Sequence, residues 1–510
     1  MTSNPVSSIL ENVSPRTAVA VLVLLTIVFR IVSYVSSYRR LSHIPGPPLA
    51  AWTNLWWVRA ATSRKGHLYL YEALEKYGPL VRIAPNILVT SDTDLVRKVN
   101  AVRSPYRKSD WYKAFRFDAD RENAFSETNK DNHARLKSKL TPGYSGKENP
   151  NLEPDMDKVI LTFVDLIKSK YVSKTGSLKP VDIGQKIQFL TLDIITCLAS
   201  GRPFGWLEDE DKYEYIATME ANFPAMNFMS AVPVLSRLMR APAFQRMTLP
   251  TVKDRVGMGK VKAVAHEIIA KRFEENKTQK QPRNDMLQSM INHGLNEGEI
   301  ADDSLLQILA GSDTSGTILR SALIFTIANP RVYHRLQAEV TSAGVPTDQV
   351  ISHARAQELP YLNAVIKETL RYYPVNTGLN PKVVGAEGDI YNGLHIPPGT
   401  EIGYSAWALY RHNPIYGADC AHFRPDRWIE ADPDLLARME REHELVFLTG
   451  RYKCLGERIA RIELLKCLFE MMRRFDFSFM DPLRPLQKED NYGLWIQRGL
   501  WVRVEELEVK

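Results

Sequence analysis

Residues 447–456 read FLTGRYKCLG, and an amphipathic run follows them from 457 to 475. Cys454 therefore lies between glycine-spaced loop residues and the start of a predicted helix. A thiol at a helix N-terminus is close to unpaired backbone N–H groups and to the positive end of the helix dipole, and both stabilise its thiolate. This position makes Cys454 a candidate metal ligand. The alternative, which position alone favours, is a cysteine that packs as a small apolar side chain.

The composition is that of a large globular protein. The chain has 510 residues, of which 44% are hydrophobic and 25% charged, and this argues against disorder and against a polytopic membrane protein. The net charge, 66 − 59 = +7, is spread thinly and includes no long basic run, so we expect no nucleic-acid partner. A reducing compartment fits best, because no CxxC pair or zinc spacing occurs among Cys197, Cys420, Cys454 and Cys467.

The N-terminal region predicts a membrane anchor. An apolar run at 18–36 is interrupted by Arg30 and followed by two arginines and a proline cluster at 44–48. A cleaved signal peptide is the alternative, but no small-residue cleavage site precedes the prolines. By the positive-inside rule the remaining chain is then cytosolic. We predict four parts: a lumenal tail (1–17), a transmembrane anchor (18–36), a basic and proline-rich hinge (37–50) and one large domain (51–510).

Most of the large domain is predicted to be helical. The clearest helix covers 303–329, would be about 40 Å long, and is apolar at both ends but polar at 311–317. Poor helix formers at the buried centre of a helix are a local conflict that is typical of functional sites. A loop joining two helices, or a kink, would give the same pattern. Further segments are predicted as helices at 155–170, 259–276 and 361–373, a hairpin at 80–90, and short strands within 389–400.

Four motifs occur together in this chain. They are AGSDTS at 310–315, ETLR at 368–371, FRPDRW at 423–428 and the stretch at 447–456. In this order they resemble the cytochrome P-450 superfamily over nearly the whole chain, and the predicted anchor resembles its microsomal members. Residues 491–500 are similar to fungal secondary-metabolism members of the pisatin-demethylase type. The resemblance implies a mainly α fold with small β-sheets, with haem b between the long central helix and the cysteine loop.

The resemblance also implies roles for the residues of the cysteine loop. Cys454 would be the axial thiolate ligand of the haem iron, which favours O–O cleavage. Phe447 would shield the sulfur, and Gly450 and Gly456 would allow close backbone approach.

On the long helix, Asp313 and Thr314 match the proton-delivery pair of the family, and Gly311 would leave room for dioxygen. A structural ion-pair triad, expected to support the haem-binding core, would be formed by Glu368, Arg371 and Arg427.

The cations expected at the haem propionates depart from the family pattern. Tyr452 stands where Arg or His is common, two residues before the cysteine. His133 and Lys137 replace a Trp and an Arg four apart, and Lys382 replaces an arginine. Lysine lacks the bidentate fork of arginine, so propionate binding would be less rigid unless Arg135 or Arg451 compensates. The alternative for either lysine is a solvated surface charge.

The implied function is a membrane-anchored monooxygenase of the endoplasmic reticulum. It would use O2 and electrons from a separate NADPH-cytochrome P-450 reductase, with cytochrome b5 as a further donor, and Arg451, Lys453, Arg458 and Arg461 could receive that acidic partner. A lipophilic fungal terpenoid, polyketide or alkaloid intermediate would contact residues 111–117, 223–229, 375–379 and 492–495. A haem-thiolate sensor or electron-transfer protein, or a haem-free scaffold, remains the alternative.

Overall fold

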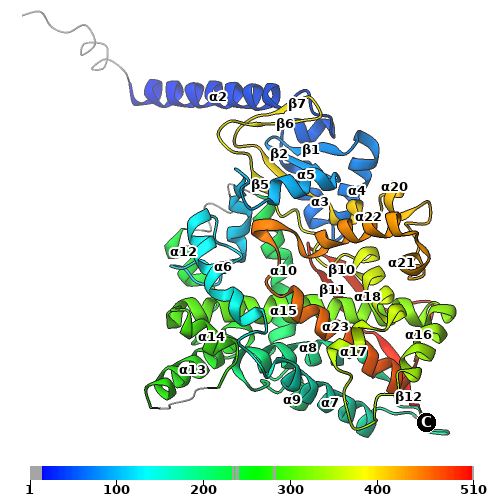
Figure 1. Cartoon of the computed structure of the whole chain (residues 1–510). Coiled ribbons are helices and arrows are strands. Elements are labelled where there is room, and N and C mark those ends of the chain that lie inside the picture. Colours follow the sequence, from blue (N-terminus) through cyan, green and yellow to red (C-terminus); the bar gives the residue numbers. More distant parts are fainter. Residues whose placement is uncertain (1–13, 233–234, 236–240, 279–282, 508–510) are drawn as a thin grey trace, which may run out of the picture.

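The computed structural model describes residues 14–232, 235, 241–278 and 283–507. The prediction of a mainly helical fold with small sheets is confirmed (Figure 1). Its centre is α15, which spans Glu297–Ile327 and crosses the molecule. At 1.5 Å per residue its 31 residues extend about 46 Å.

Helix α15 begins earlier than predicted and does not break. Asn296 and Glu299 form a capping box that starts the helix ahead of position 303. The helix is continuous through 311–317, so the alternative of two helices joined by a loop is wrong. Hydroxyl groups in this stretch bond within the helix or to its neighbours. Ser312 Oγ donates to the Ile308 carbonyl at 2.7 Å, and Thr191 Oγ1 donates to the Ser312 carbonyl at 3.0 Å.

Helices surround α15 and bury it. Helix α8 (Ile183–Ser200) lies along it and is buried on nearly all sides. The structure confirms four further predicted helices. They are α7 (Leu152–Lys170), predicted at 155–170; α13 (Gly257–Thr278), predicted at 259–276; α18 (Pro360–Tyr372), predicted at 361–373; and α23 (Glu457–Arg474), predicted at 457–475.

The other described helices form the outer parts of the body. They are α3 (Leu55–Thr62), α4 (Gly66–Tyr77), α5 (Thr93–Asn100), α6 (Lys130–Tyr144), α9 (Trp206–Asp209), α10 (Tyr215–Ala231), α12 (Pro242–Thr248), α14 (Met286–Asn292), α16 (Pro330–Ser342), α17 (His353–Gln357), α19 (Ala406–Leu409), α20 (Asn413–Tyr416), α21 (Arg427–Glu430) and α22 (Pro433–His443), with short 3-10 helices η1 (Pro48–Ala51), η2 (Asp110–Phe115), η3 (Glu444–Phe447) and η4 (Gly450–Tyr452).

A five-stranded sheet has the order β1-β2-β8-β5-β3. The predicted hairpin is confirmed as β1 (Leu80–Ala84) and β2 (Ile87–Thr90), joined by β8 (Glu401–Tyr404), β5 (Lys382–Val383) and β3 (Arg107–Lys108). The strands expected within 389–400 are the pair β6 (Asp389–Tyr391) and β7 (Leu394–Ile396). The C-terminal strands pair with one another and with β4 (Val181–Asp182); they are β9 (Phe475–Phe479), β10 (Lys488–Asn491), β11 (Trp495–Arg498) and β12 (Trp501–Glu506).

The predicted anchor at 18–36 lies in α2 (Pro15–Arg40), which extends away from the body (Figure 1). The lumenal tail predicted at 1–17 falls mostly outside the described residues. Within the part of the chain that the structure describes, no helix has both the length and the apolar character needed to cross a membrane.

Candidate active site

The cysteine loop joins η3 to α23 and holds Cys454 at the start of the second helix. The Cys454 backbone N–H donates to the Phe447 carbonyl at 2.8 Å and closes the loop. Burial raises the pKa of the Cys454 thiol, and backbone N–H groups of Gly456 and Glu457 oppose that rise by donating to the sulfur. The site therefore offers hydrogen bonds to a thiolate, but burial disfavours a thiolate that has no positive charge beside it. A bound metal ion would supply the missing positive charge.

The two loop glycines serve different purposes. Gly450 has a φ of 63°, and a Cβ there would lie 2.3 Å from the Asn100 carbonyl oxygen, so α5 leaves no room for a side chain. A Cβ on Gly456 would lie 3.8 Å from the Cys454 sulfur, which is an ordinary contact. Gly456 therefore contributes its N–H group here. The Phe447 ring is half-buried and lies 5.0 Å from the Arg461 guanidinium.

Cys454 and two residues at the centre of α15 are less buried than their surroundings. All four cysteines are described, and among them Cys454 alone is exposed, although burial is the largest influence on its pKa. Ala310 is also exposed and Thr314 half-buried, in a helix that is buried along most of its length. Leu455, next to the cysteine, packs against the same apolar cluster as Leu306 of α15. The cysteine loop therefore packs close to α15.

Asp313 and Thr314 point in different directions. The Gln188 amide on α8 donates to Asp313 Oδ1 at 2.8 Å, and Arg320 Nη1 donates to the Gln188 amide oxygen at 2.8 Å. Thr314 Oγ1 instead donates to the Ala310 carbonyl at 2.7 Å. Burial raises the pKa of Asp313 to about 7. Sequence reasoning paired these two residues, but it did not identify Gln188, which holds the carboxyl.

Gly311 has a packing role in the structure. A Cβ at Gly311 would lie 2.8 Å from the Ile195 side chain on α8, so the glycine allows α8 and α15 to pack closely. The role expected for it beside dioxygen stays a prediction.

A buried carboxyl that sequence reasoning missed lies on the other side of α15. Ser315 Oγ donates to Glu463 Oε2 of α23 at 2.7 Å. Burial raises the pKa of Glu463 to about 8, so this carboxyl is neutral at pH 7. The sequence signal that could have identified Glu463 is an acidic residue on the otherwise apolar face of the helix that follows Cys454.

Two buried lysines face each other across the small sheet. Lys108 of β3 stands directly opposite Lys382 of β5, and their side chains are 4% and 1% exposed. Like charges in this arrangement repel and destabilise a sheet. The Tyr452 ring lies 5.6 Å from the Lys108 ammonium and 4.8 Å from that of Lys382. Tyr452, which stands in place of an expected cation, thus packs against two cations, of which sequence reasoning identified one.

Neutral oxygen atoms accept hydrogen bonds from both lysine side chains. Lys108 donates to the carbonyl groups of Ala124 and Phe125, both at 2.9 Å, while Lys382 donates to the Tyr112 hydroxyl and to the Asn380 carbonyl. Burial lowers the pKa of Lys108 to about 7, and it lowers that of Lys382 well below its usual value. Both pKa shifts would be reversed by an anion between the two side chains.

The other residues expected near the propionates have different partners in the structure. His133 lies 5.3 Å from the Tyr452 ring, and burial together with the surrounding cations lowers its pKa to about 3. Lys137 donates to the carbonyl groups of Arg451 and Lys453, both at 2.7 Å, and so braces the cysteine loop. The Arg451 Nη1 atom is buried without a hydrogen-bond partner among the described residues. Arg135 pairs instead with Glu299 at 2.7 Å.

The chemistry of this donor set fits haem. A haem carries two carboxylates at one edge and needs an axial ligand at its centre. Lys108, Lys382 and the unpaired nitrogen of Arg451 could hold the carboxylates, and Cys454 could ligate the iron. The repulsion between the two lysines would then become attraction to the propionates.

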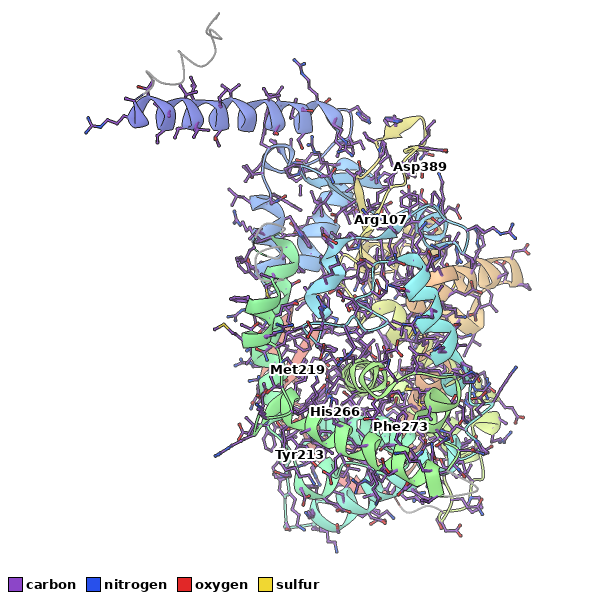
Figure 2. All side chains as sticks on the ribbon, turned by 90° about the vertical axis from the view of Figure 1, so that its left-hand side faces the viewer. Arg107, Tyr213, Met219, His266, Phe273 and Asp389 are labelled. Carbon is purple, nitrogen blue, oxygen red and sulfur yellow. The ribbon has the colours of Figure 1, made fainter. Side chains whose placement is uncertain are left out.

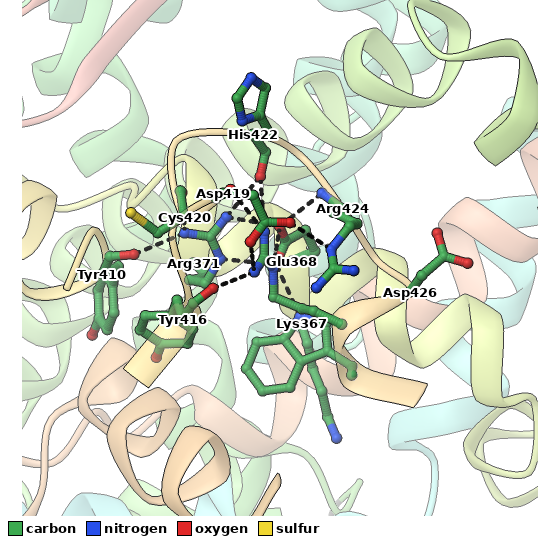
Figure 3. A network of polar contacts seen from close by, with 12 residues as sticks. Lys367, Glu368, Arg371, Tyr410, Tyr416, Asp419, Cys420, His422, Arg424 and Asp426 are labelled. Atoms are coloured by element: carbon green, nitrogen blue, oxygen red, sulfur yellow. Dashed lines mark hydrogen bonds and ion pairs between the residues drawn. The ribbon is translucent and has the colours of Figure 1, made fainter. Parts of the chain in front are cut away.

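Glu368, Arg371 and Arg427 meet in one buried network. Figure 3 shows Glu368 and Arg371 at its centre. Arg371 donates two hydrogen bonds to Glu368, at 2.7 and 2.8 Å, and Arg427 donates a third at 3.1 Å. The Trp428 indole N–H adds a fourth at 3.0 Å, which sequence reasoning did not anticipate. Burial opposes ionisation of Glu368, but the two arginines outweigh it and hold the pKa of Glu368 below its usual value. The network ties α18 to the segment that leads into α22 and the cysteine loop.

Comparison with known proteins agrees with this geometry. A model of the family described as cytochrome P450 matches residues 44–499. The chain belongs to the cytochrome P450 family. It is 38% identical over 489 residues to cytochrome P450 monooxygenase ABA1 of Pyricularia oryzae, covering 94% of each chain. It is 35% identical to cytochrome P450 monooxygenase aba1 of Botryotinia fuckeliana, covering 92% of each, and 32% identical to abl1 of Leptosphaeria maculans, covering 91% of this chain and 83% of that protein.

This cytochrome P450 is therefore a monooxygenase, and its family implies a haem cofactor. The residue roles given above for haem binding and proton delivery stay predictions, because they rest on the geometry of this chain alone.

Replacing Lys382 with methionine tests the lysine pair. The variant removes a buried ammonium that faces a second one, but it also removes the hydrogen bonds to Tyr112 and Asn380, so the stability of the haem-free protein should change by less than about 1 kcal/mol. It also removes a charge-assisted contact to a propionate, so haem should dissociate about tenfold faster. Thermal unfolding of the haem-free protein and haem transfer to apomyoglobin measure the two effects. Lys271→Met, at a side chain that is 77% exposed, is the control and should change neither. Slower haem loss in Lys382→Met would contradict the assignment.

A cavity of about 480 Å³ with a mixed polar and apolar wall lies between η2, α10 and residues 244–259. Figure 2 views this side of the molecule and labels Met219, one of its lining residues. Residues 113–117 and 225–229, from two of the segments expected to contact substrate, contribute to its wall. Its methionines are Met219, Met226, Met229, Met247 and Met258. Flexible thioether side chains adapt to irregular apolar molecules.

Proposed function

We propose that this chain is a membrane-associated haem-thiolate monooxygenase that oxidises a lipophilic small molecule. It would use O2 and electrons that an NADPH-cytochrome P-450 reductase supplies, with cytochrome b5 as a further donor. The observation that carries the proposal is the position of Cys454. Cys454 lies in the loop that leads directly into α23, where the backbone N–H groups of Gly456 and Glu457 lower the pKa of its thiol against the effect of burial.

Bound haem b would supply the iron at which dioxygen is activated, and an axial thiolate would favour O–O cleavage. The residues of this chain would then supply the protons. Thr314 is half-buried, and its hydroxyl is oriented by its bond to the Ala310 carbonyl. Asp313 Oδ1 is held by Gln188, and a carboxyl with a pKa of about 7 can both hold and release a proton near neutral pH.

The Asp313 carboxyl predicts a pH dependence. Its pKa is raised to about 7 by burial, so it carries a proton below that pH and is ionised above it. Product formed per NADPH consumed should therefore fall as the pH rises through 7. In Asp313→Asn, which cannot transfer a proton, the rate should be roughly 100-fold lower, and this pH dependence should be lost.

The control for this prediction is Asp303→Asn, a matched change on the same helix. Asp303 is also buried with a pKa raised to about 7, but it accepts from the Ala124 backbone N–H at 2.9 Å, away from Thr314. Turnover of Asp303→Asn should keep the wild-type pH profile. An Asp313→Asn enzyme with wild-type rate and profile would exclude this carboxyl from proton delivery.

The substrate class is inferred from the Met-lined cavity, which suits an apolar molecule. The relatives named above are fungal, and we infer a fungal secondary-metabolite intermediate of the terpenoid, polyketide or alkaloid class. Metabolite profiles of a host with and without this chain, grown under ¹⁸O2, test both points. A product with one ¹⁸O atom is expected, and NADPH consumption without labelled product would overturn the proposal.

The reductase would dock near the cysteine loop. Lys453 and Arg458 are exposed there, while Glu457 pairs with both Lys453 and Arg461 at 2.8 and 3.0 Å and reduces the positive charge of the patch. Basic surfaces steer anionic partners. Charge reversal at Lys453 and Arg458 should raise the KM for reductase, and a rate independent of both changes would exclude this surface.

Helix α2 would attach the body to the endoplasmic reticulum membrane, with the catalytic part in the cytosol. Among its described side chains, Val19, Leu22, Leu24 and Leu25 are about 60% exposed. Exposed apolar surface of this extent marks an interaction site. Removing residues 1–40 should move the enzyme from the microsomal to the soluble fraction, and a truncated enzyme that still pellets with microsomes would contradict this role.

A further inference from the structure

A second, much smaller cavity carries an inference about substrate recognition. Its volume is about 10 Å³, enough for one oxygen-sized group. Four polar nitrogens belong to residues that line it: Trp57 Nε1, His67 Nδ1, Trp111 Nε1 and Asn491 Nδ2. Their residues are 4%, 7%, 9% and 2% exposed. The two indole N–H groups have no hydrogen-bond partner within the described part of the chain, while the side chains of His67 and Asn491 interact with each other. Two unpaired donors beside one small cavity are unusual, because buried polar groups are almost always paired.

The nitrogens are fixed in place by their neighbours. Asn491 Oδ1 accepts from Thr377 Oγ1 at 2.8 Å and from the Gly493 N–H at 3.2 Å, so the orientation of its amide is fixed. The His67 ring packs against Trp495 and Trp407, at 4.8 and 4.6 Å between ring centroids. The site therefore exists before any ligand arrives.

The lining selects a neutral oxygen atom. Two indole N–H groups and one amide NH2 are donors, so the partner must be an acceptor. No lysine, arginine, aspartate or glutamate lines the cavity. Burial lowers the pKa of His67 to about 4, so the imidazole is neutral at physiological pH and can donate or accept. A carboxylate would be larger than the cavity and would find no cation in its wall.

The position of the cavity relates it to substrate. All four segments expected to contact substrate contribute to its wall, through Trp111, Asn227, Thr377, Gly378, Leu379 and Gly493. Two of these segments are joined, because the N–H groups of Thr377 and Gly378 donate to the Gly493 carbonyl at 2.9 and 3.1 Å. Gly378 lies beside the Trp111 indole, where a Cβ would be in ordinary contact at 3.5 Å from the ring.

We propose that Trp57, Trp111, Asn491 and His67 bind one hydroxyl or carbonyl oxygen of the substrate and so hold the molecule at one end. The inference rests on the proposed monooxygenase function and extends it. The substrate is then a lipophilic molecule that already carries an oxygen atom, and an earlier oxygenation or an oxygenated precursor must supply it. Anchoring one end also restricts which carbon atoms can reach the iron.

Alkylimidazoles can test the site without knowledge of the substrate. We would titrate the holoenzyme with N-alkylimidazoles of increasing chain length, each ending in either a methyl or a hydroxyl group, and follow the spectral shift caused by nitrogen coordination. A terminal hydroxyl weakens binding in an apolar pocket. At the chain length that reaches the cavity, the hydroxyl probe should instead bind about tenfold tighter than the methyl probe.

Trp57→Phe and Trp111→Phe should remove that preference and leave binding of the methyl probes unchanged. The control is Trp206→Phe, which also deletes a buried indole N–H without a described partner but lies in α9, outside the cavity lining. It should keep the preference.

Two outcomes would overturn the inference. A hydroxyl penalty that is equal at every chain length would mean that the cavity holds only water. If Trp111→Phe lowers the affinity for the hydroxyl and methyl probes equally, the indole has a packing role only. Failure of all imidazoles to shift the spectrum would instead contradict the haem-binding function itself.

Discussion

Cys454→Ala should abolish the red-shifted Soret band that a thiolate-ligated haem shows when reduced and exposed to CO, and turnover should become undetectable. The sulfur is the thiolate ligand expected in this site, and alanine offers no replacement for it. The fold should survive, because Cys454 is exposed and its side chain contributes little to the core. Absorption spectra and circular dichroism of the purified variant measure both effects.

Cys467→Ala is the matched control. This second cysteine lies on α23 and is 1% exposed in the apolar core. Its removal should leave the band intact and cost about 1 kcal/mol of stability through lost packing. If the thiolate band persists in Cys454→Ala and disappears in Cys467→Ala, the ligand assignment is wrong.

Glu368→Ala should prevent accumulation of folded enzyme. Glu368 and Arg371 are fully buried, and Arg427 is 3% exposed. Deleting the carboxylate leaves two guanidinium groups buried without their counter-ion, which costs roughly 3–5 kcal/mol, a large part of the stability of a typical domain. The segment before the cysteine loop would lose its attachment to α18. Soluble yield, haem content and chemical denaturation of any folded fraction measure the effect.

The comparison for this change is Glu440→Ala. Glu440 is 41% exposed and pairs with Lys367, so its loss should cost less than about 1 kcal/mol. A Glu368→Ala protein that unfolds within about 1 kcal/mol of the wild type would show that the buried network is dispensable. Because the pKa of Glu368 is lowered on folding, its stabilising contribution is present above the ordinary glutamate pKa and is lost as the pH falls through the lowered value.

The alternative of a sensor or a scaffold loses support once the family is known, since this cytochrome P450 is a monooxygenase. What differs from the family pattern is concentrated at the propionate end of the site. Tyr452 contributes an aromatic face in place of a positive charge, and the charge comes from Lys108 and Lys382 on the sheet. Cation–π contacts with Tyr452 and hydrogen bonds to separate oxygen atoms orient these lysines in place of an arginine fork.

Sequence alone determined the features that depend on neighbouring residues. The position of Cys454 at a helix start follows from the residues around it, and so do the hairpin at 80–90 and the helices that carry Glu368 and Asp313. The helix pattern and the capping residues are local, so they can be read from the chain. The start of α15 was misplaced only because the capping box at Asn296 was overlooked.

Tertiary structure decided everything that depends on which distant segments meet. Lys108 and Lys382 became a pair only when β3 and β5 aligned, and Gly311 acquired its packing role only when α8 lay against α15. The four nitrogens of the small cavity come from separate parts of the chain. Side-chain direction and cross-strand register arise from long-range packing, so no local pattern encodes them. The chain's local order therefore determined the chemistry near Cys454, and the fold decided which charges and hydrogen-bond donors surround it.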